Sequence, residues 1–113
     1  MQRSRRYGLG VVKLAAVTVE VHVSGRIETG RFADFTEAAS HWVEYRDRTG
    51  YVRPRLLQAL SGEMNAVLLV FEYPDLGAYE REEARVFEDG EYVRLAMAMP
   101  FVGPLRYVIY RFI

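Results

Sequence analysis

The 113-residue sequence predicts an α+β fold whose elements follow the order βαββαβ. Three observations carry this prediction. Residues 17–23 alternate between valine and polar side chains, with the two-residue period of a strand. Residues 31–48 repeat apolar side chains every three or four positions, which is typical of an amphipathic helix. Residues 66–73 are almost continuously apolar and end at Pro74, which is typical of a central strand.

The first strand and the first helix have recognisable boundaries. The strand is expected over residues 17–23 and can begin as early as Val11. Its valines share one face, and the other face carries Thr18, Glu20 and His22. Residues 24–30 contain two glycines and are expected to form a turn. The helix over residues 31–48 stops before Gly50, which can adopt a left-handed cap. Its apolar stripe consists of Phe32, Phe35, Ala39 and Trp42.

The middle of the chain predicts a β-hairpin. Residues 51–60 are expected to form an edge strand, because Pro54 cannot donate a backbone hydrogen bond. Residues 61–65 form the turn, and residues 66–73 return as the central strand, apolar on both faces.

The last third of the chain predicts two helices and a final strand. Asp75 is a suitable N-cap for a helix over residues 76–88. One side of that helix carries Leu76, Tyr79, Glu83 and Phe87. A short helix over residues 91–99 has an inner side composed of Tyr92, Leu95, Ala96 and Met99. Residues 100–104 contain two prolines and a glycine and are expected to be a loop. Residues 105–113 are expected to form the last strand.

This order is that of the ferredoxin-like split βαβ fold, with one four-stranded antiparallel sheet and helices on one face. We expect residues 11–113 to form a single ferredoxin-like domain, preceded by a flexible basic arm over residues 1–10. Lys13 interrupts the apolar run that follows this arm, so we expect no signal peptide and a cytoplasmic protein. No stretch reaches the roughly 18 apolar residues of a membrane span, so no membrane partner is expected.

Composition excludes several classes of function. The formal net charge is zero, whereas nucleic-acid-binding domains usually carry a basic surplus. The absence of cysteine excludes disulfides, thiolate catalysis and cysteine zinc sites. Two histidines alone do not predict a metal site, and no cofactor-binding motif is present, so neither a metal nor a cofactor is expected.

The strand over residues 66–73 and its flanks resemble a known pattern. NIPSNAP-type proteins of the dimeric α+β barrel superfamily have a hairpin glycine and asparagine, followed by an apolar strand that ends in Trp-x-Tyr-x-Asp-Leu. The matching positions here are Gly62, Asn65, Phe71, Tyr73, Asp75 and Leu76, with Phe71 in place of tryptophan. Gly30-Arg31-Phe32 is similar to the Gly-Lys-Leu that opens the first helix of the family, and Glu91-Tyr92 resembles an aromatic position in its short helix. An arginine and a tyrosine common in the family's first strand are replaced by Glu20 and His22.

The resemblance implies a homodimer, in which two sheets pack back to back with the helices outside. The residues agree with this independently. Helices can cover only one face of the sheet, yet the strand over residues 66–73 is apolar on both faces, so a second subunit is the simplest cover.

Two groups of strand residues are candidate catalytic side chains. Glu20 and His22 share a face that Glu72 can join, and a carboxylate beside an imidazole can form an acid/base pair. The alternative is a polar contact between subunits. Tyr73, with Phe71 on the same face, can line a substrate pocket between sheet and helices; the alternative is a core tyrosine bonded to the backbone.

The first helix and the edge strand supply further candidates for substrate binding. His41 and Tyr45 are four residues apart and can form a His-Tyr pair, the alternative being a solvated flank of the helix, while Trp42 between them belongs to the core stripe. Arg55 can bind a carboxylate or pair with a nearby acid, and the same choice applies to Arg53, Arg106 and Arg111.

Together with these residues, the resemblance implies a cofactor-independent enzyme of the dimeric α+β barrel type that acts on an apolar or aromatic, polyketide-like metabolite by acid/base chemistry, as a cyclase, isomerase or monooxygenase. The alternative is a non-catalytic dimeric module for ligand binding or assembly. RNA recognition on the same strand order is disfavoured, because residues 67–71 lack the exposed aromatic and basic side chains that it needs.

Overall fold

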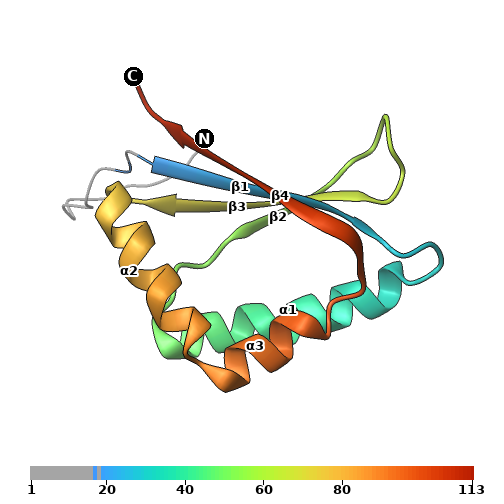
Figure 1. Ribbon diagram of the computed structural model, residues 1–113. Helices are drawn as coiled ribbons and strands as arrows, with labels where there is room; N and C mark the ends of the chain where they lie inside the picture. The colour runs from blue at the N-terminus through green and yellow to red at the C-terminus, as the bar shows by residue number, and fades with distance from the viewer. Residues whose placement is uncertain (1–16, 18) are drawn as a thin grey trace, which may run out of the picture.

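The computed structural model describes residues 17 and 19–113. These residues form a four-stranded antiparallel sheet in the order β2-β3-β1-β4, and the helices all lie on one face of it (Figure 1). The strands are β1 (Val19–Ile27), β2 (Arg55–Gln58), β3 (Ala66–Tyr73) and β4 (Phe101–Arg111). The helices are α1 (Phe32–Thr49), α2 (Leu76–Phe87) and α3 (Gly90–Met97). The predicted α+β ferredoxin-like architecture is confirmed, while the predicted arm and the early strand start at Val11 lie outside the described residues.

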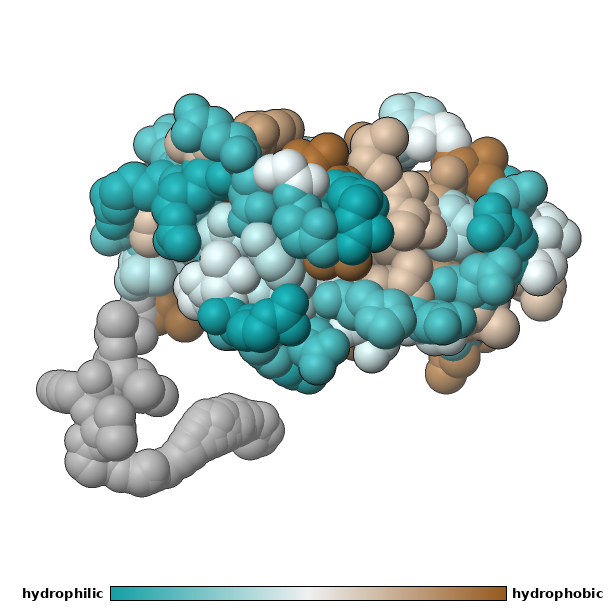
Figure 2. All heavy atoms as spheres, turned by 90° about the horizontal axis from the view of Figure 1, so that it is seen from below, coloured by the Kyte–Doolittle hydropathy of each residue, from teal (hydrophilic) through white to brown (hydrophobic). Residues whose placement is uncertain are grey.

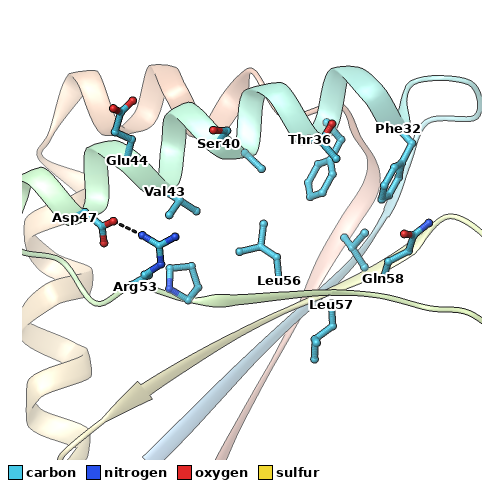
Figure 3. Close-up of a pocket in the computed structure, with 14 residues that line it drawn as sticks. Phe32, Thr36, Ser40, Val43, Glu44, Asp47, Arg53, Leu56, Leu57 and Gln58 are labelled. Atoms are coloured by element: carbon cyan, nitrogen blue, oxygen red, sulfur yellow. Dashed lines mark hydrogen bonds and ion pairs between the residues drawn. The ribbon is translucent and has the colours of Figure 1, made fainter. Parts of the chain in front are cut away.

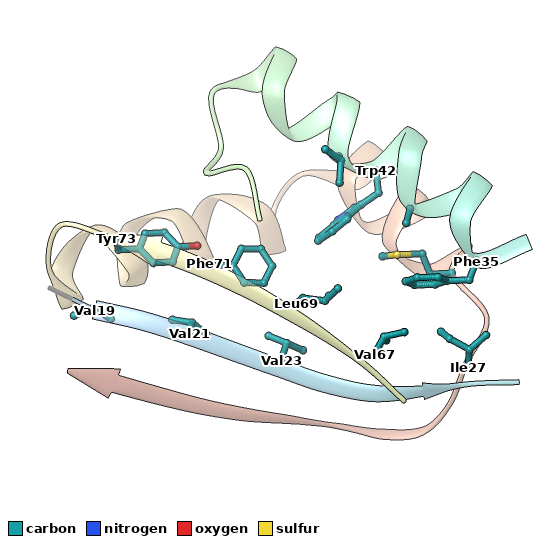
Figure 4. Close-up of a cluster of buried hydrophobic side chains, with 13 residues drawn as sticks. Val19, Val21, Val23, Ile27, Phe35, Trp42, Val67, Leu69, Phe71 and Tyr73 are labelled. Atoms are coloured by element: carbon teal, nitrogen blue, oxygen red, sulfur yellow. The ribbon is translucent and has the colours of Figure 1, made fainter. Parts of the chain in front are cut away.

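The core lies between the sheet and the helices, as Figure 4 shows. Alternate residues of the two central strands face the helices and are buried: Val19, Val21 and Val23 from β1 and Val67, Leu69, Phe71 and Tyr73 from β3. The α1 stripe packs against them through Phe35, Ala39 and Trp42. The side chain of Asp75 caps α2 by accepting a hydrogen bond from Ala78 N at 2.7 Å. The local sequence signals and the observed burial therefore specify the same strands and helix.

The predicted turn after β1 is wrong in its boundary, and so is the predicted loop before β4. β1 continues to Ile27 and pairs there with Phe101, at the start of β4. The register between the strands shifts near Gly25, where β4 bulges through Gly103, which has a φ of 74°. A bulge accommodates both a glycine and a proline, so Pro104 does not end the strand.

The predicted second strand is too long. β2 covers only Arg55–Gln58, immediately after Pro54, and lies at the edge of the sheet as expected. Tyr51 is buried, and its backbone N–H donates to Arg46 O at 2.9 Å, which turns the chain back along α1.

The side of α2 that carries Leu76, Tyr79, Glu83 and Phe87 is only partly buried, through Tyr79 and Glu83. Leu76 and Phe87 are exposed, whereas Glu82 and Val86 are the buried residues of this helix. The Glu82 carboxylate faces inward because it pairs with Arg46, a buried cation of α1, as described below. α3 packs on the core through Tyr92, Leu95 and Ala96, and Met99 beyond its end is buried, as predicted.

The two faces of the molecule differ. Hydrophilic side chains predominate on the helical side, as the view from that side shows (Figure 2). The opposite face of the sheet, here called the open face, carries no helix (Figure 1) and includes Glu20, His22 and Val70. In the described part of the chain, no helix combines the length and the apolar character needed to cross a membrane.

Candidate functional site

A cavity of about 320 Å³, here called the inner cavity, lies between the sheet and the helices. Its lining combines the inward-facing residues of the strands with side chains of all three helices. Tyr73, Phe71 and Trp42, all predicted from the sequence as site residues, lie in this lining. Most of the wall is apolar, and the polar groups gather around one buried arginine.

Arg46 is the centre of that polar group. Its side chain is 2% exposed, and it forms a buried ion pair with Glu82. Its Nε donates to the backbone oxygen of Val52 at 2.6 Å, and its Nη1 donates to the Tyr92 hydroxyl at 2.7 Å. Glu82 also accepts from the Tyr73 hydroxyl at 2.6 Å and from Val52 N at 2.8 Å. The cluster therefore joins α1, α2, α3 and β3 through one hydrogen-bond network.

Four aromatic rings surround the guanidinium. Its carbon lies between 4.8 and 5.6 Å from the ring centres of Trp42, Tyr51, Phe71 and Tyr92. Ring faces attract a cation, and the attraction strengthens when water is excluded. The rings and Glu82 together offset the cost of burying this charge.

The tyrosines of the inner cavity are hydrogen-bond donors at neutral pH. Burial raises the pKa of Tyr73 well above its usual value, and the hydrogen bond to Glu82 raises it further. Burial also raises the pKa of Tyr92, against the lowering effect of Arg46 and Trp42. Burial lowers the pKa of Arg46, but Tyr92 and Glu82 more than offset this, so its pKa lies above the usual value. Tyr73 consequently cannot serve as a phenolate base near neutrality.

A second carboxylate stands at the edge of the inner cavity. Glu83 lines the cavity, is only partly buried, and accepts a long hydrogen bond of 3.3 Å from the Tyr79 hydroxyl. Burial, followed by the charge of Glu83, raises the pKa of Tyr79 to about 12. Unlike Glu82, Glu83 has no cationic partner among the described residues. It is the carboxylate of the cavity with free capacity to accept a proton.

The structure separates Glu20 and His22 from Tyr73. The two side chains are hydrogen-bonded to each other at 2.8 Å on the open face, and His22 packs edge-on against Tyr110. Glu20 pairs across the strands with Glu72, which shares its face as expected. Tyr73 pairs with Val19 and points to the helices instead. The predicted acid/base residues therefore lie on opposite faces of the sheet.

The remaining predicted residues lie outside the inner cavity. Arg55 is on the open face and contacts Glu72 at 3.3 Å and Glu20 at 3.5 Å. His41 is exposed on α1. Tyr45 donates to the two carboxylate oxygens of Asp89 at 2.9 Å each, and not to His41.

A wider hollow of about 590 Å³, here called the outer groove, runs between α1 and β2 (Figure 3). Leu56 points into it, and Leu57 points away (Figure 3). Its charged residues Arg53 and Asp47 form an ion pair with each other and are exposed. Exposed ion pairs contribute little to stability. None of the polar residues that line the outer groove is buried, so the inner cavity is the better candidate site.

Sequence reasoning missed Arg46, Glu82, Glu83 and Tyr92 as site residues. A signal for two of them was present. Arg46 follows Trp42 by four residues and so continues the apolar stripe of α1, while Glu82 lies midway between Ala78 and Val86 on α2. A charged residue at an inward position of each of two helices indicates a buried pair. In residues 17 and 19–113, no group of three His, Cys, Asp or Glu side chains is placed to hold a metal ion.

Solved structures share this fold. An uncharacterised NIPSNAP domain protein from Burkholderia xenovorans superposes with a TM-score of 0.68 at 19% identity, covering 81% of this chain and 91% of that one. A NIPSNAP family protein of unknown function from Agrobacterium tumefaciens gives 0.70 at 11% identity, covering 84% and 87%. A candidate antibiotic biosynthesis monooxygenase from Bordetella bronchiseptica gives 0.68 at 14% identity, covering 87% and 99%.

These superpositions establish a common fold, and the resemblance seen around residues 66–73 is confirmed at that level. No protein-family profile and no curated protein matches the sequence.

Proposed function

We propose that this protein is a NIPSNAP-like, cofactor-independent enzyme of the dimeric α+β barrel type, which acts by acid/base chemistry on an apolar or aromatic, polyketide-like metabolite held in the inner cavity. The observation that carries the proposal is the cavity itself. Its volume of about 320 Å³ lies in the range of small-molecule sites, and its walls are mostly apolar with a few convergent polar groups. A fold shared with a candidate antibiotic biosynthesis monooxygenase supports the same class of chemistry.

The polar side chains of the inner cavity have different roles in such a reaction. Glu83 is the proton acceptor, because it is an unpaired carboxylate at the cavity edge. Tyr73 and Glu82 are already bonded to each other and hold Arg46 in place, so they position the site instead of reacting. Proton transfer by a well-placed carboxylate accelerates a reaction about 10²- to 10⁴-fold.

Deuterium exchange at the acidic methylene of anthrone tests this proposal. Anthrone is a flat tricyclic ketone, and exchange in D₂O reports proton abstraction whatever reaction follows. We expect the protein to accelerate exchange, Glu83→Gln to abolish most of the acceleration, and Glu80→Gln, on the exposed side of the same helix, to retain it. Anthrone that binds without accelerated exchange would instead identify a non-catalytic binding module.

We further propose that the protein is a homodimer that joins through the open face. Leu57, Val108 and Tyr110 are 46%, 44% and 50% exposed on this face, which no helix of the described chain covers. The satisfied Glu20–His22 hydrogen bond fits a polar contact inside such an interface, which is also what a non-catalytic assembly module would need.

Sedimentation velocity at micromolar concentration tests the dimer. We expect the wild-type protein to sediment as a dimer and Val108→Arg to sediment as a monomer, since an unpaired charge would be buried at the interface. The control Leu60→Arg changes a residue of the β2–β3 loop that is 95% exposed and should remain a dimer. A monomeric wild-type protein would refute the proposal.

A further inference from the structure

Trp42 places a buried hydrogen-bond donor at the inner cavity. The indole is 3% exposed and lines the cavity, and it descends from α1 toward Phe71 of β3 (Figure 4). The indole acts on the nearby Tyr92 hydroxyl, whose pKa it lowers, but its Nε1 makes no hydrogen bond of good geometry with that hydroxyl or with any other described residue. An indole nitrogen can only donate, and buried donors are almost always satisfied in folded proteins. A ligand in the cavity is the natural source of the missing acceptor.

Tyr92 supplies a second donor beside it. The rings of Tyr92 and Trp42 lie 6.2 Å apart, and both residues line the inner cavity. The Tyr92 oxygen accepts from Arg46 Nη1 at 2.7 Å. Because an arginine never accepts, the hydroxyl cannot return its own proton to that partner. No described residue accepts this proton, so the Tyr92 O–H remains available to a ligand.

Arg46 determines which ligand atom suits these donors. A hydroxyl that accepts from a cation becomes a stronger donor, because the bonds of a chain polarise one another. The donors therefore favour an oxygen with partial negative charge. Glu82 already balances the charge of Arg46, so the site calls for a neutral acceptor and not an anion. The apolar walls around it, which include Val21, Leu69 and Phe71, fit a hydrocarbon body.

We propose that Trp42 and Tyr92 form a carbonyl-binding subsite, which selects flat apolar ligands that carry a ketone oxygen at one end. This inference rests on the proposed function, since it specifies the ligand of the same cavity. In this subsite Trp42 and Tyr92 only bind the ligand, and neither residue has to transfer a proton.

Two probes of the same shape test the subsite. 1-Tetralone and tetralin share a fused bicyclic skeleton, and only 1-tetralone has a carbonyl oxygen. Trp42 is the one tryptophan of the chain, so a ¹⁵N-labelled sample gives a single indole N–H signal that reports on the subsite directly. We expect 1-tetralone to bind about tenfold more tightly than tetralin, as one or two net hydrogen bonds would provide. We also expect 1-tetralone, and not tetralin, to move the indole signal downfield.

Tyrosine variants complete the experiment. Tyr92→Phe keeps the ring and removes the donor, so the preference for 1-tetralone should shrink severalfold while tetralin binds as before. Tyr45→Phe is the matched control, because it removes a hydroxyl that bonds Asp89 outside the inner cavity. Equal affinity of the wild-type protein for both probes would overturn the subsite but leave the apolar cavity as proposed. An undiminished preference in Tyr92→Phe would also overturn it, and failure of both probes to bind would overturn the subsite and the proposed function together.

Discussion

Replacement of Glu82 by glutamine should destabilise the protein strongly, because it removes the charge that balances Arg46. The two side chains are 10% and 2% exposed, so water cannot substitute for the lost partner. Removing one member of a buried ion pair costs about 3–5 kcal/mol. The carboxylate oxygen that accepts from both Arg46 and Tyr73 would in addition become an amide group facing two donors. We therefore expect a loss near the middle of that range, about 4 kcal/mol.

Urea unfolding followed by the fluorescence of Trp42 measures this loss. Trp42 is the one tryptophan and is buried within 5.5 Å of the Arg46 guanidinium. With a slope of about 2 kcal/mol per molar urea, a loss of about 4 kcal/mol lowers the midpoint by about 2 M. Glu80→Gln, on the exposed side of α2, should shift the midpoint by less than about 0.25 M, because surface substitutions usually change stability by less than about 0.5 kcal/mol.

A double-mutant cycle separates the pair from the rest of the network. Arg46→Met should destabilise by a similar amount, because it leaves the Glu82 carboxylate buried without a cation. The double variant should lose less than the sum of the two single losses, since no uncompensated charge remains. Strict additivity, or an effect of Glu82→Gln no larger than that of Glu80→Gln, would show that the buried pair does not hold the helices on the sheet.

Two further predictions concern the sheet and the α2–α3 junction. Gly25→Ala should cost about 1–3 kcal/mol, because the added methyl would lie 2.6 Å from Leu105 Cδ2; Gly90→Ala, where nothing lies within 4 Å, is the control, and equal urea midpoints would contradict the packing argument. Hydrogen bonds from Tyr92 N, Tyr51 and Tyr45 lower the pKa of Asp89 below its usual value of 3.8, against the effect of burial. Its stabilising effect is therefore complete above pH 3.8 and is lost as the pH falls through the lower folded-state pKa. The stability advantage of the wild type over Asp89→Asn should accordingly disappear in acid, and an advantage independent of pH would argue against it.

The order of elements could be predicted because local signals and burial agree. Alternating valines, the α1 stripe and the Asp75 cap each specify one element, and β1 and α1 bury the faces that their patterns indicate. The extension of β1 past Gly25 could not be predicted, because a glycine and a proline normally interrupt a strand. Only the partner strand shows that a bulge in β4 accommodates them.

The separation of His22 from Tyr73 was within reach of the sequence. Neighbouring residues of a strand point to opposite faces, so Glu72 and Tyr73 cannot both face the side of Glu20 and His22. Because Glu72 shares the face of Glu20 and His22, Tyr73 must face the helices, as it does in the structure. Arg46 and Glu82 were missed for a different reason. The buried side of a helix is usually identified from its apolar residues. A charged residue in the same stripe then resembles an interruption, because its partner on another helix is not visible in the local sequence.

The free edge of β4 affects how the chain avoids disordered aggregation. β4 is one of the two edge strands of the sheet that the described residues form, and its residues 107–110 are half-exposed and consist of two tyrosines, a valine and an isoleucine. Such a segment can template fibril growth through its unpaired backbone groups. Arg106 precedes this segment and Arg111 follows it, and the Gly103–Pro104 bulge interrupts the strand just before Arg106. Flanking charges and a proline are the usual gatekeepers of unavoidable apolar strands. These features oppose open-ended stacking along the edge, and they leave the open face of the sheet as the route for the proposed association.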